Sequence, residues 1–89
     1  MSSITLAFSS SLVKTLADLG AGSRGVIVSV RGADAGRVDR LLALGVTPGA
    51  RVQVLQTFPG IVFECDQTEL AVERSVADSI YVRVMTTVD

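Results

Sequence analysis

Three glycines, at positions 20, 22 and 25, match the spacing of a dinucleotide-binding loop, and Asp39 follows roughly 20 positions beyond the first of them. Such a loop lies between a strand and a helix, so that the helix N-terminus faces the pyrophosphate. Here the last glycine is followed by Val26–Val30, whose alternating residues predict a strand instead. The glycines are therefore interpreted as turn residues, and no nucleotide cofactor is expected.

Cys65 lies among acids, with Glu64 and Asp66 on either side and Glu69 close by, and this group could be drawn as a metal site. Adjacent residues of a strand point to opposite faces, so Cys65 is expected to point inward while Glu64 and Asp66 point outward. The chain has no histidine and no second cysteine to complete a ligand set. The sequence therefore predicts a buried cysteine and no dedicated metal site.

The sequence also lacks the general base that a serine nucleophile needs. The chain has many serines, but no histidine could act as their base, and Lys14 is the only lysine that could replace one. We therefore expect a protein that is not an enzyme.

The charge balance excludes further classes. Eight basic residues against nine acidic ones give a net charge of −1, which offers no general attraction for nucleic acid. No apolar run approaches the roughly 20 residues that cross a bilayer, so no direct membrane insertion is expected. A single cysteine and the absence of a signal-peptide pattern favour a cytoplasmic location.

The elements begin with one short helix and the turn that follows it. Asp34 is a plausible N-cap, and apolar residues at helical spacing predict a helix over about 35–44. Gly45 fits the left-handed position after the helix, and Pro48 with Gly49 fits the centre of a type II turn. We call the segment 41–49 the elbow; a strand is expected to follow it.

Further strands are predicted at Arg51–Thr57, Ile61–Asp66, Glu69–Glu73 and Ile80–Val84, with short connections typical of antiparallel hairpins. A helical turn is expected near 75–79, where Ser75 and Asp78 resemble a capping box. The prediction is a mainly β fold, a small and partly open barrel, in one domain spanning 1–89. Residues 1–11 form an N-terminal extension, in which Ile4–Phe8 alternate as in an extra strand.

Apolar residues on the outward side of these strands predict a binding surface. Alternation predicts that the inward-facing core positions are Val26, Val28, Val30, Val52, Val54, Ile61, Phe63, Cys65, Leu70, Val72, Ile80, Val82 and Val84. Ile27, Leu55, Val62 and Tyr81 then face outward, and the hairpin tip adds Phe58 and Pro59. Apolar patches of this kind mark interaction sites. The alternative is that a bulge or a second small core covers some of these residues.

A resemblance to a known family extends this interpretation. The chain resembles the FeoA family in Leu16–Gly20, in the strand near Val28, in the elbow with Arg40, in Leu70–Glu73 and in the turn before Ile80. The most specific part is the elbow with its following strand, which is shared mainly with FeoA proteins and with the related C-terminal domain of iron-dependent repressors: Leu41, Leu42, Leu44, Gly45, Pro48, Gly49, Val52 and Val54.

The resemblance implies an SH3-like β-barrel that is cytoplasmic and acts as an accessory to the bacterial ferrous iron transporter FeoB. Such a protein would bind the cytosolic side of FeoB, with the GTP-binding domain as one candidate surface, and would modulate uptake without touching iron. The resemblance also implies a structural rather than a catalytic role for five elbow residues, Leu41, Leu44, Gly45, Pro48 and Gly49. Two features depart from the family: the extra Ile4–Ser11 stretch and the tight connection at residues 58–60.

Two other functions remain open from the sequence. The same barrel occurs in metal-dependent repressors, so the chain could be a regulatory module acting with a transcriptional repressor, although it lacks a helix-turn-helix. Alternatively, the exposed patch could close a homo-oligomer, which would make the chain a self-associating structural module.

Overall fold

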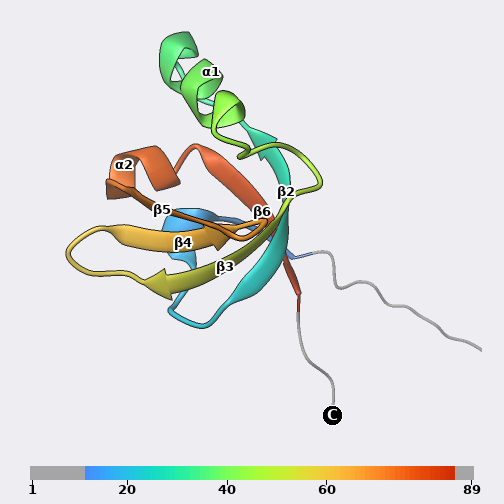
Figure 1. Ribbon diagram of the computed structural model, residues 1–89, viewed down its shortest axis with the longest axis vertical. Helices are drawn as coiled ribbons and strands as arrows, with labels where there is room; N and C mark the ends of the chain where they lie inside the picture. Colours follow the sequence, from blue (N-terminus) through green and yellow to red (C-terminus); the bar gives the residue numbers. More distant parts are fainter. Residues whose placement is uncertain (1–11, 86–89) are drawn as a thin grey trace, which may run out of the picture.

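The computed structural model describes residues 12–85, so the strand predicted at Ile4–Phe8 lies outside the described residues. In this part of the chain six strands and three short helical segments follow one another: β1 (Val13–Thr15), the 3-10 helix η2 (Leu16–Asp18), β2 (Arg24–Val30), α1 (Ala35–Ala43), β3 (Arg51–Gln56), β4 (Ile61–Cys65), β5 (Thr68–Val72), α2 (Arg74–Ala77) and β6 (Ile80–Met85). All strand pairs are antiparallel, in the order β1-β6-β2-β3-β4-β5. The sheet coils without closing (Figure 1), which confirms the predicted partly open, mainly β architecture.

Short turns explain the antiparallel pairing of the middle strands. β4 and β5 are joined by two residues only, Asp66 and Gln67, which both have positive φ (46° and 75°). Positive φ at both central residues matches the twist of a two-residue hairpin. The pairing then runs in regular register from Cys65↔Thr68 to Ile61↔Val72.

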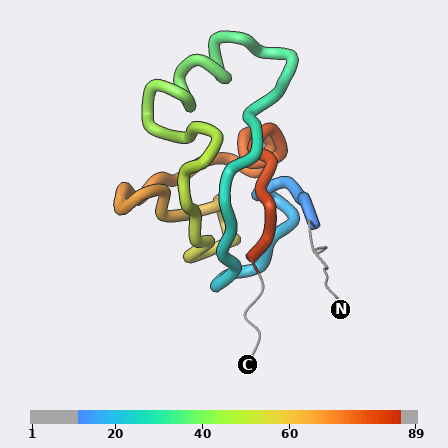
Figure 2. The backbone as a smooth tube through the Cα atoms, turned by 90° about the vertical axis from the view of Figure 1, so that its right-hand side faces the viewer, coloured from blue at the N-terminus to red at the C-terminus, as the bar shows by residue number. Residues whose placement is uncertain are grey.

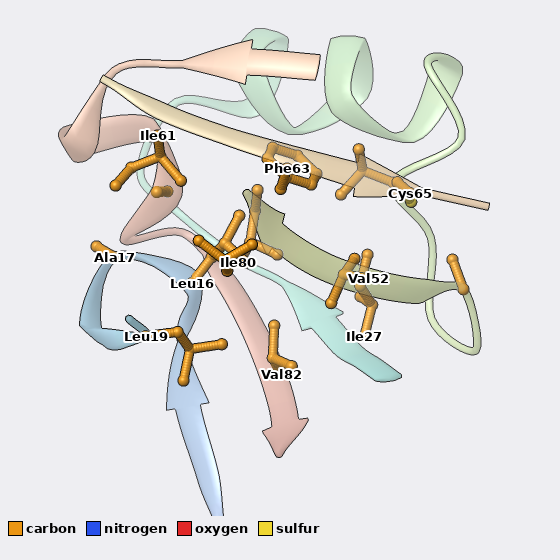
Figure 3. Packing of buried hydrophobic residues seen from close by; sticks show 14 of the residues in the cluster. Leu16, Ala17, Leu19, Ile27, Val52, Ile61, Phe63, Cys65, Ile80 and Val82 are labelled. Carbon is orange, nitrogen blue, oxygen red and sulfur yellow. The ribbon is translucent and has the colours of Figure 1, made fainter. Parts of the chain in front are cut away.

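The core lies inside the coiled sheet and is closed at one end by η2. Phe63, Ile61 and Ile80 are fully buried, and Leu16 of η2 joins them from the other side (Figure 3). Seven of the predicted core positions are buried, namely Val52, Val54, Ile61, Phe63, Cys65, Ile80 and Val82. The predicted core positions Val30, Leu70, Val72 and Val84 are half-buried against this cluster.

Strand β2 faces the opposite way from the prediction. Ile27, expected outside, is 1% exposed, whereas Val26 and Val28, expected in the core, are half-buried outside the core cluster. The pairing of β2 with β6 shifts between Ile27 and Ser29, which is a bulge. Because three apolar residues follow one another here, the alternation alone did not define the buried face.

Helix α1 ends as predicted at the elbow. The Asp34 side chain caps it by accepting from the Arg37 backbone N–H at 3.0 Å, and this hydrogen bond holds the pKa of Asp34 below its usual value. At the other end, Val46 N–H donates to Leu41 O and Gly45 N–H donates to Leu42 O, each at 3.0 Å. This pair of bonds, with φ of 96° at Gly45, is a Schellman motif.

The elbow then directs the chain into β3. Gly49 has φ of 93°, and Ala50 N–H donates to Thr47 O at 3.0 Å, as a type II turn requires. Leu41 is buried, but Leu44 is 56% exposed, and Val46 takes the buried position instead. Helix α1 projects from the sheet beyond the ends of β2 and β6 (Figures 1 and 2).

The helical turn expected near residues 75–79 is confirmed, at Arg74–Ala77, but its predicted cap is wrong. The short segment before β6 is α2, whose N-cap is Glu73 without a side-chain hydrogen bond, so Ser75 does not cap it. At the start of the described chain, strand β1 leads directly into the 3-10 helix η2. Leu12 already hydrogen-bonds through its carbonyl to Val84 N–H, at 2.9 Å, which extends the β1–β6 pairing.

Candidate functional site

An apolar surface gathers where β3 turns into β4. Leu55 is 42% exposed and Phe58 81% exposed, while Pro59 is exposed and Val62 half-buried. The β3–β4 pairing shifts between Val54 and Gln56, so Leu55 and Gln56 together oppose Val62. Leu55 and Val62 therefore share the outer face of the sheet, beside the tip.

Strand β5 extends this surface by one residue that the sequence analysis did not include. Ala71 pairs directly with Val62, is exposed, and lies on the same outer face. Its position follows from the hairpin register, which the two-residue turn at Asp66 and Gln67 determines. We call Leu55, Phe58, Pro59, Val62 and Ala71 the hairpin patch.

Side-chain hydrogen bonds to backbone carbonyls support the tip of the β3–β4 hairpin. The Gln56 side-chain amide donates at 2.8 Å to Phe58 O, the carbonyl oxygen of the cis peptide bond between Phe58 and Pro59. Arg74 of α2 donates to Thr57 O and to Ala17 O, each at 2.9 Å. One guanidinium thus joins the tip, α2 and η2, and Phe58 is presented to solvent from a braced loop.

The other two predicted patch residues lie elsewhere. Ile27 belongs to the core, as described above, and can contact no partner without unfolding. Tyr81 is half-buried on β6, with the Arg31 guanidinium 4.6 Å from the centre of its ring. Because β2 and β3 separate β6 from β4 in the sheet, Tyr81 is not part of the hairpin patch.

The surroundings of Cys65 are those of a core residue rather than of a reactive or metal-binding thiol. Cys65 is buried, its thiol donates to Gly45 O at 3.5 Å, and burial, with the nearby Asp66 carboxylate, raises its pKa. A raised pKa keeps the thiol protonated and unreactive near neutral pH. Among residues 12–85, no three histidine, cysteine or acidic side chains lie together as metal ligands would.

An open hollow of about 540 Å³ is lined by residues from the ends of β2, β3, β4 and β6. Its charged lining combines Arg24 and Arg51 with Glu64 and Asp66. The Asp66 carboxylate already accepts from Arg51 backbone N–H at 3.0 Å. A hollow lined by both signs of charge lacks the one-sided field that would concentrate a phosphate or a metal ion.

No helix within residues 12–85 is long and apolar enough to cross a membrane.

Comparisons with known proteins agree with this architecture. The family model described as the FeoA domain matches residues 14–84. No curated protein sequence matches the chain at a significant level.

Three solved FeoA structures are similar. An iron uptake regulatory protein (FeoA) is 29% identical, with a TM-score of 0.75, over 83% of this chain and all of that one. FeoA from Chlorobium tepidum is 32% identical, with a TM-score of 0.73, over 84% of this chain and 73% of that one. Stenotrophomonas maltophilia FeoA, a prokaryotic SH3 domain protein solved with zinc, is 26% identical, with a TM-score of 0.70, over 76% and 87% of the two chains.

A manganese-dependent transcriptional repressor shares the fold at 21% identity, with a TM-score of 0.74, over 82% of this chain but only 42% of that protein. At this identity the likeness shows a common barrel and nothing about function. The family model, in contrast, covers nearly all the described residues, and the resemblance carried by the elbow is confirmed. The chain is a member of the FeoA family, small SH3-like proteins associated with ferrous iron transport.

Proposed function

We propose that the chain is a cytoplasmic, non-enzymatic accessory protein of ferrous iron uptake that binds the cytosolic side of the transporter FeoB through the hairpin patch. Family membership supports the association with iron transport. The observation that carries the binding mode is Phe58, a large apolar side chain that is 81% exposed on a loop fixed by Gln56 and Arg74. A preorganised aromatic residue loses little conformational entropy on binding, which makes it a suitable anchor.

Isothermal titration tests this proposal. The full chain is titrated with the GTP-binding domain of its cognate FeoB, and in parallel with the full-length transporter in lipid nanodiscs, each with and without a GTP analogue. Saturable binding to either supports the proposal, and a difference between nucleotide states identifies nucleotide control. No binding to the full-length transporter in any state contradicts it.

Phe58→Ser is the corresponding variant. It removes the apolar anchor without touching the core, so the free energy of unfolding stays within about 0.5 kcal/mol of wild type, while affinity for FeoB falls by about 2 kcal/mol, roughly 30-fold. Leu44→Ser is the matched control, because Leu44 is 56% exposed on the elbow, outside the hairpin patch. Equal affinity losses for the two variants would remove the hairpin patch from the proposal.

A further inference from the structure

Strand β5 ends the sheet, and no other strand within residues 12–85 pairs with its outer edge. It is the last strand in the sheet order, and β4 is the only element with which it makes extensive contact among residues 12–85. No turn, loop or cap hydrogen bond between described residues reaches the backbone of Thr68–Val72. This outer edge, called the free edge below, therefore carries backbone groups that no described residue pairs with.

The hairpin register identifies these groups. In a two-residue hairpin the closing pair, here Cys65↔Thr68, exchanges both backbone hydrogen bonds, and such pairs recur at every second residue. Thr68, Leu70 and Val72 thus direct their N–H and C=O groups toward β4. Glu69 and Ala71 direct theirs outward, where an added strand could pair with them.

Most of the common protections of a sheet edge are missing from β5, whose one charged residue is Glu69. Natural edges are shortened, bulged, or marked with lysine or proline to prevent pairing with another chain. β1, at the opposite edge, has three residues and carries Lys14. β5 has five residues in unbroken register, without lysine or proline.

Side chains on both faces of β5 are incompletely covered by the described residues. Leu70 and Val72 point inward but are only half-buried, whereas Phe63 and Ile61, which pair with them on β4, are fully buried. On the outer face, Glu69 lies directly opposite Glu64, and like charges in this position destabilise a sheet. A basic residue on an added strand would lie next to Glu69 and offset this repulsion.

We propose that the free edge of β5 binds an extended segment of FeoB as an additional strand. This segment carries lysine or arginine opposite Glu69 and an apolar residue two positions away, opposite Ala71. The apolar residue then joins the hairpin patch, because Ala71 pairs with Val62. The proposal rests on the proposed function, and adds the backbone pairing and the sequence pattern of the partner segment.

Hydrogen exchange of the full chain, with and without full-length FeoB in nanodiscs, tests the pairing directly. The amides of Glu69 and Ala71 are expected to exchange at least roughly tenfold more slowly in the complex, as amides do when they enter a ladder. Those of Val13 and Thr15, on the opposite edge, are expected to stay unchanged. Slower exchange at β5 in the chain alone at high concentration would assign the edge to a second copy and overturn the proposal.

Ala71→Pro provides the variant test. Proline removes the outward N–H and is tolerated on a free edge, so the variant is expected to fold and to bind FeoB about tenfold more weakly. Val13→Pro is the matched control: Leu12 O already bonds to Val84, so Val13 points its N–H outward from the edge of β1. Glu69→Lys is expected to weaken binding as well, whereas Asp39→Lys on α1 leaves it unchanged.

The outcomes separate the two proposals. The β5 proposal is overturned if wild type and Ala71→Pro bind FeoB with equal affinity and if amide exchange at Glu69 and Ala71 does not change in the complex. That result leaves the proposed binding to FeoB in place. Absence of binding by wild type overturns both. If Ala71→Pro fails to fold, exchange in the wild-type complex and the Glu69→Lys affinity decide the question.

Discussion

At the scale of single residues, the fold depends on a few backbone positions that tolerate no ordinary side chain. Gly45 has φ of 96° in the Schellman motif, and Gly49 has φ of 93° in the turn that follows. Gly25 depends on space instead, because a Cβ there would collide with Val82 and with the carbonyl of Arg83 on β6. Gly45 and Gly49 shape the connection from α1 to β3, and Gly25 allows the close pairing of β2 with β6, which agrees with a structural rather than a chemical role for the elbow.

Gly45→Val is expected to destabilise the fold by about 1–3 kcal/mol, because a β-branched residue is strained at positive φ. No atom lies within 4 Å of the added Cβ, so the cost is conformational rather than a clash. Gly20→Val is the matched control, since Gly20 has equal space and lacks the positive φ. Chemical denaturation measures both, and equal stabilities would contradict the elbow geometry.

At the scale of elements, the braced β3–β4 tip depends on a contact with α2. Arg74 reaches both Thr57 O and Ala17 O, and therefore couples the tip to η2. This contact of Arg74 could not be predicted from the sequence. An arginine in a short helix is expected to be solvated, and its carbonyl partners come close only in the folded chain.

Arg74→Met is expected to lower the free energy of unfolding by about 1 kcal/mol, the net value of exposed hydrogen bonds to a charged donor. It should also loosen the tip, so that amide exchange near Thr57 speeds up and affinity for FeoB falls. Arg83→Met, an exposed arginine on β6, serves as the control. Unchanged exchange at the tip would show that Gln56 alone holds it.

Much of this element structure could be predicted from the sequence, for identifiable reasons. The helix over 35–44 and the elbow were predicted because Asp34, Gly45, Pro48 and Gly49 each have a specific backbone role. The buried face of β2 could not be predicted, because Val26, Ile27 and Val28 are all apolar and the bulge lies within the strand. Patterns define an element well where polar and apolar residues alternate.

The candidate site divides in the same way. Exposure of Leu55, Phe58 and Pro59 followed from strand alternation and a hairpin tip, and was confirmed. The separation of Tyr81 depends on strand order, and the role of Ala71 depends on register. Both are long-range properties that a single sequence specifies only through the folded sheet; the partner-binding role of these residues remains a prediction.

At the scale of the whole molecule, a partly open barrel leaves an apolar tip and a free sheet edge next to each other. The hairpin patch and the edge of β5 share Ala71, so one partner segment could contact both surfaces. Helix α1 projects at a different place and buries only Leu41 of its own residues. The β3–β4–β5 side of the barrel is therefore the proposed binding surface.

Uptake of radioactive ferrous iron tests the central claim most directly, in cells whose own copy is deleted and replaced by wild type, Phe58→Ser or Leu44→Ser at equal protein levels. Deletion is expected to change the rate of iron uptake. Wild type and Leu44→Ser are expected to restore the normal rate, whereas Phe58→Ser is expected to stay near the rate of the deletion strain. Full restoration by Phe58→Ser, or no effect of the deletion, would contradict the central claim.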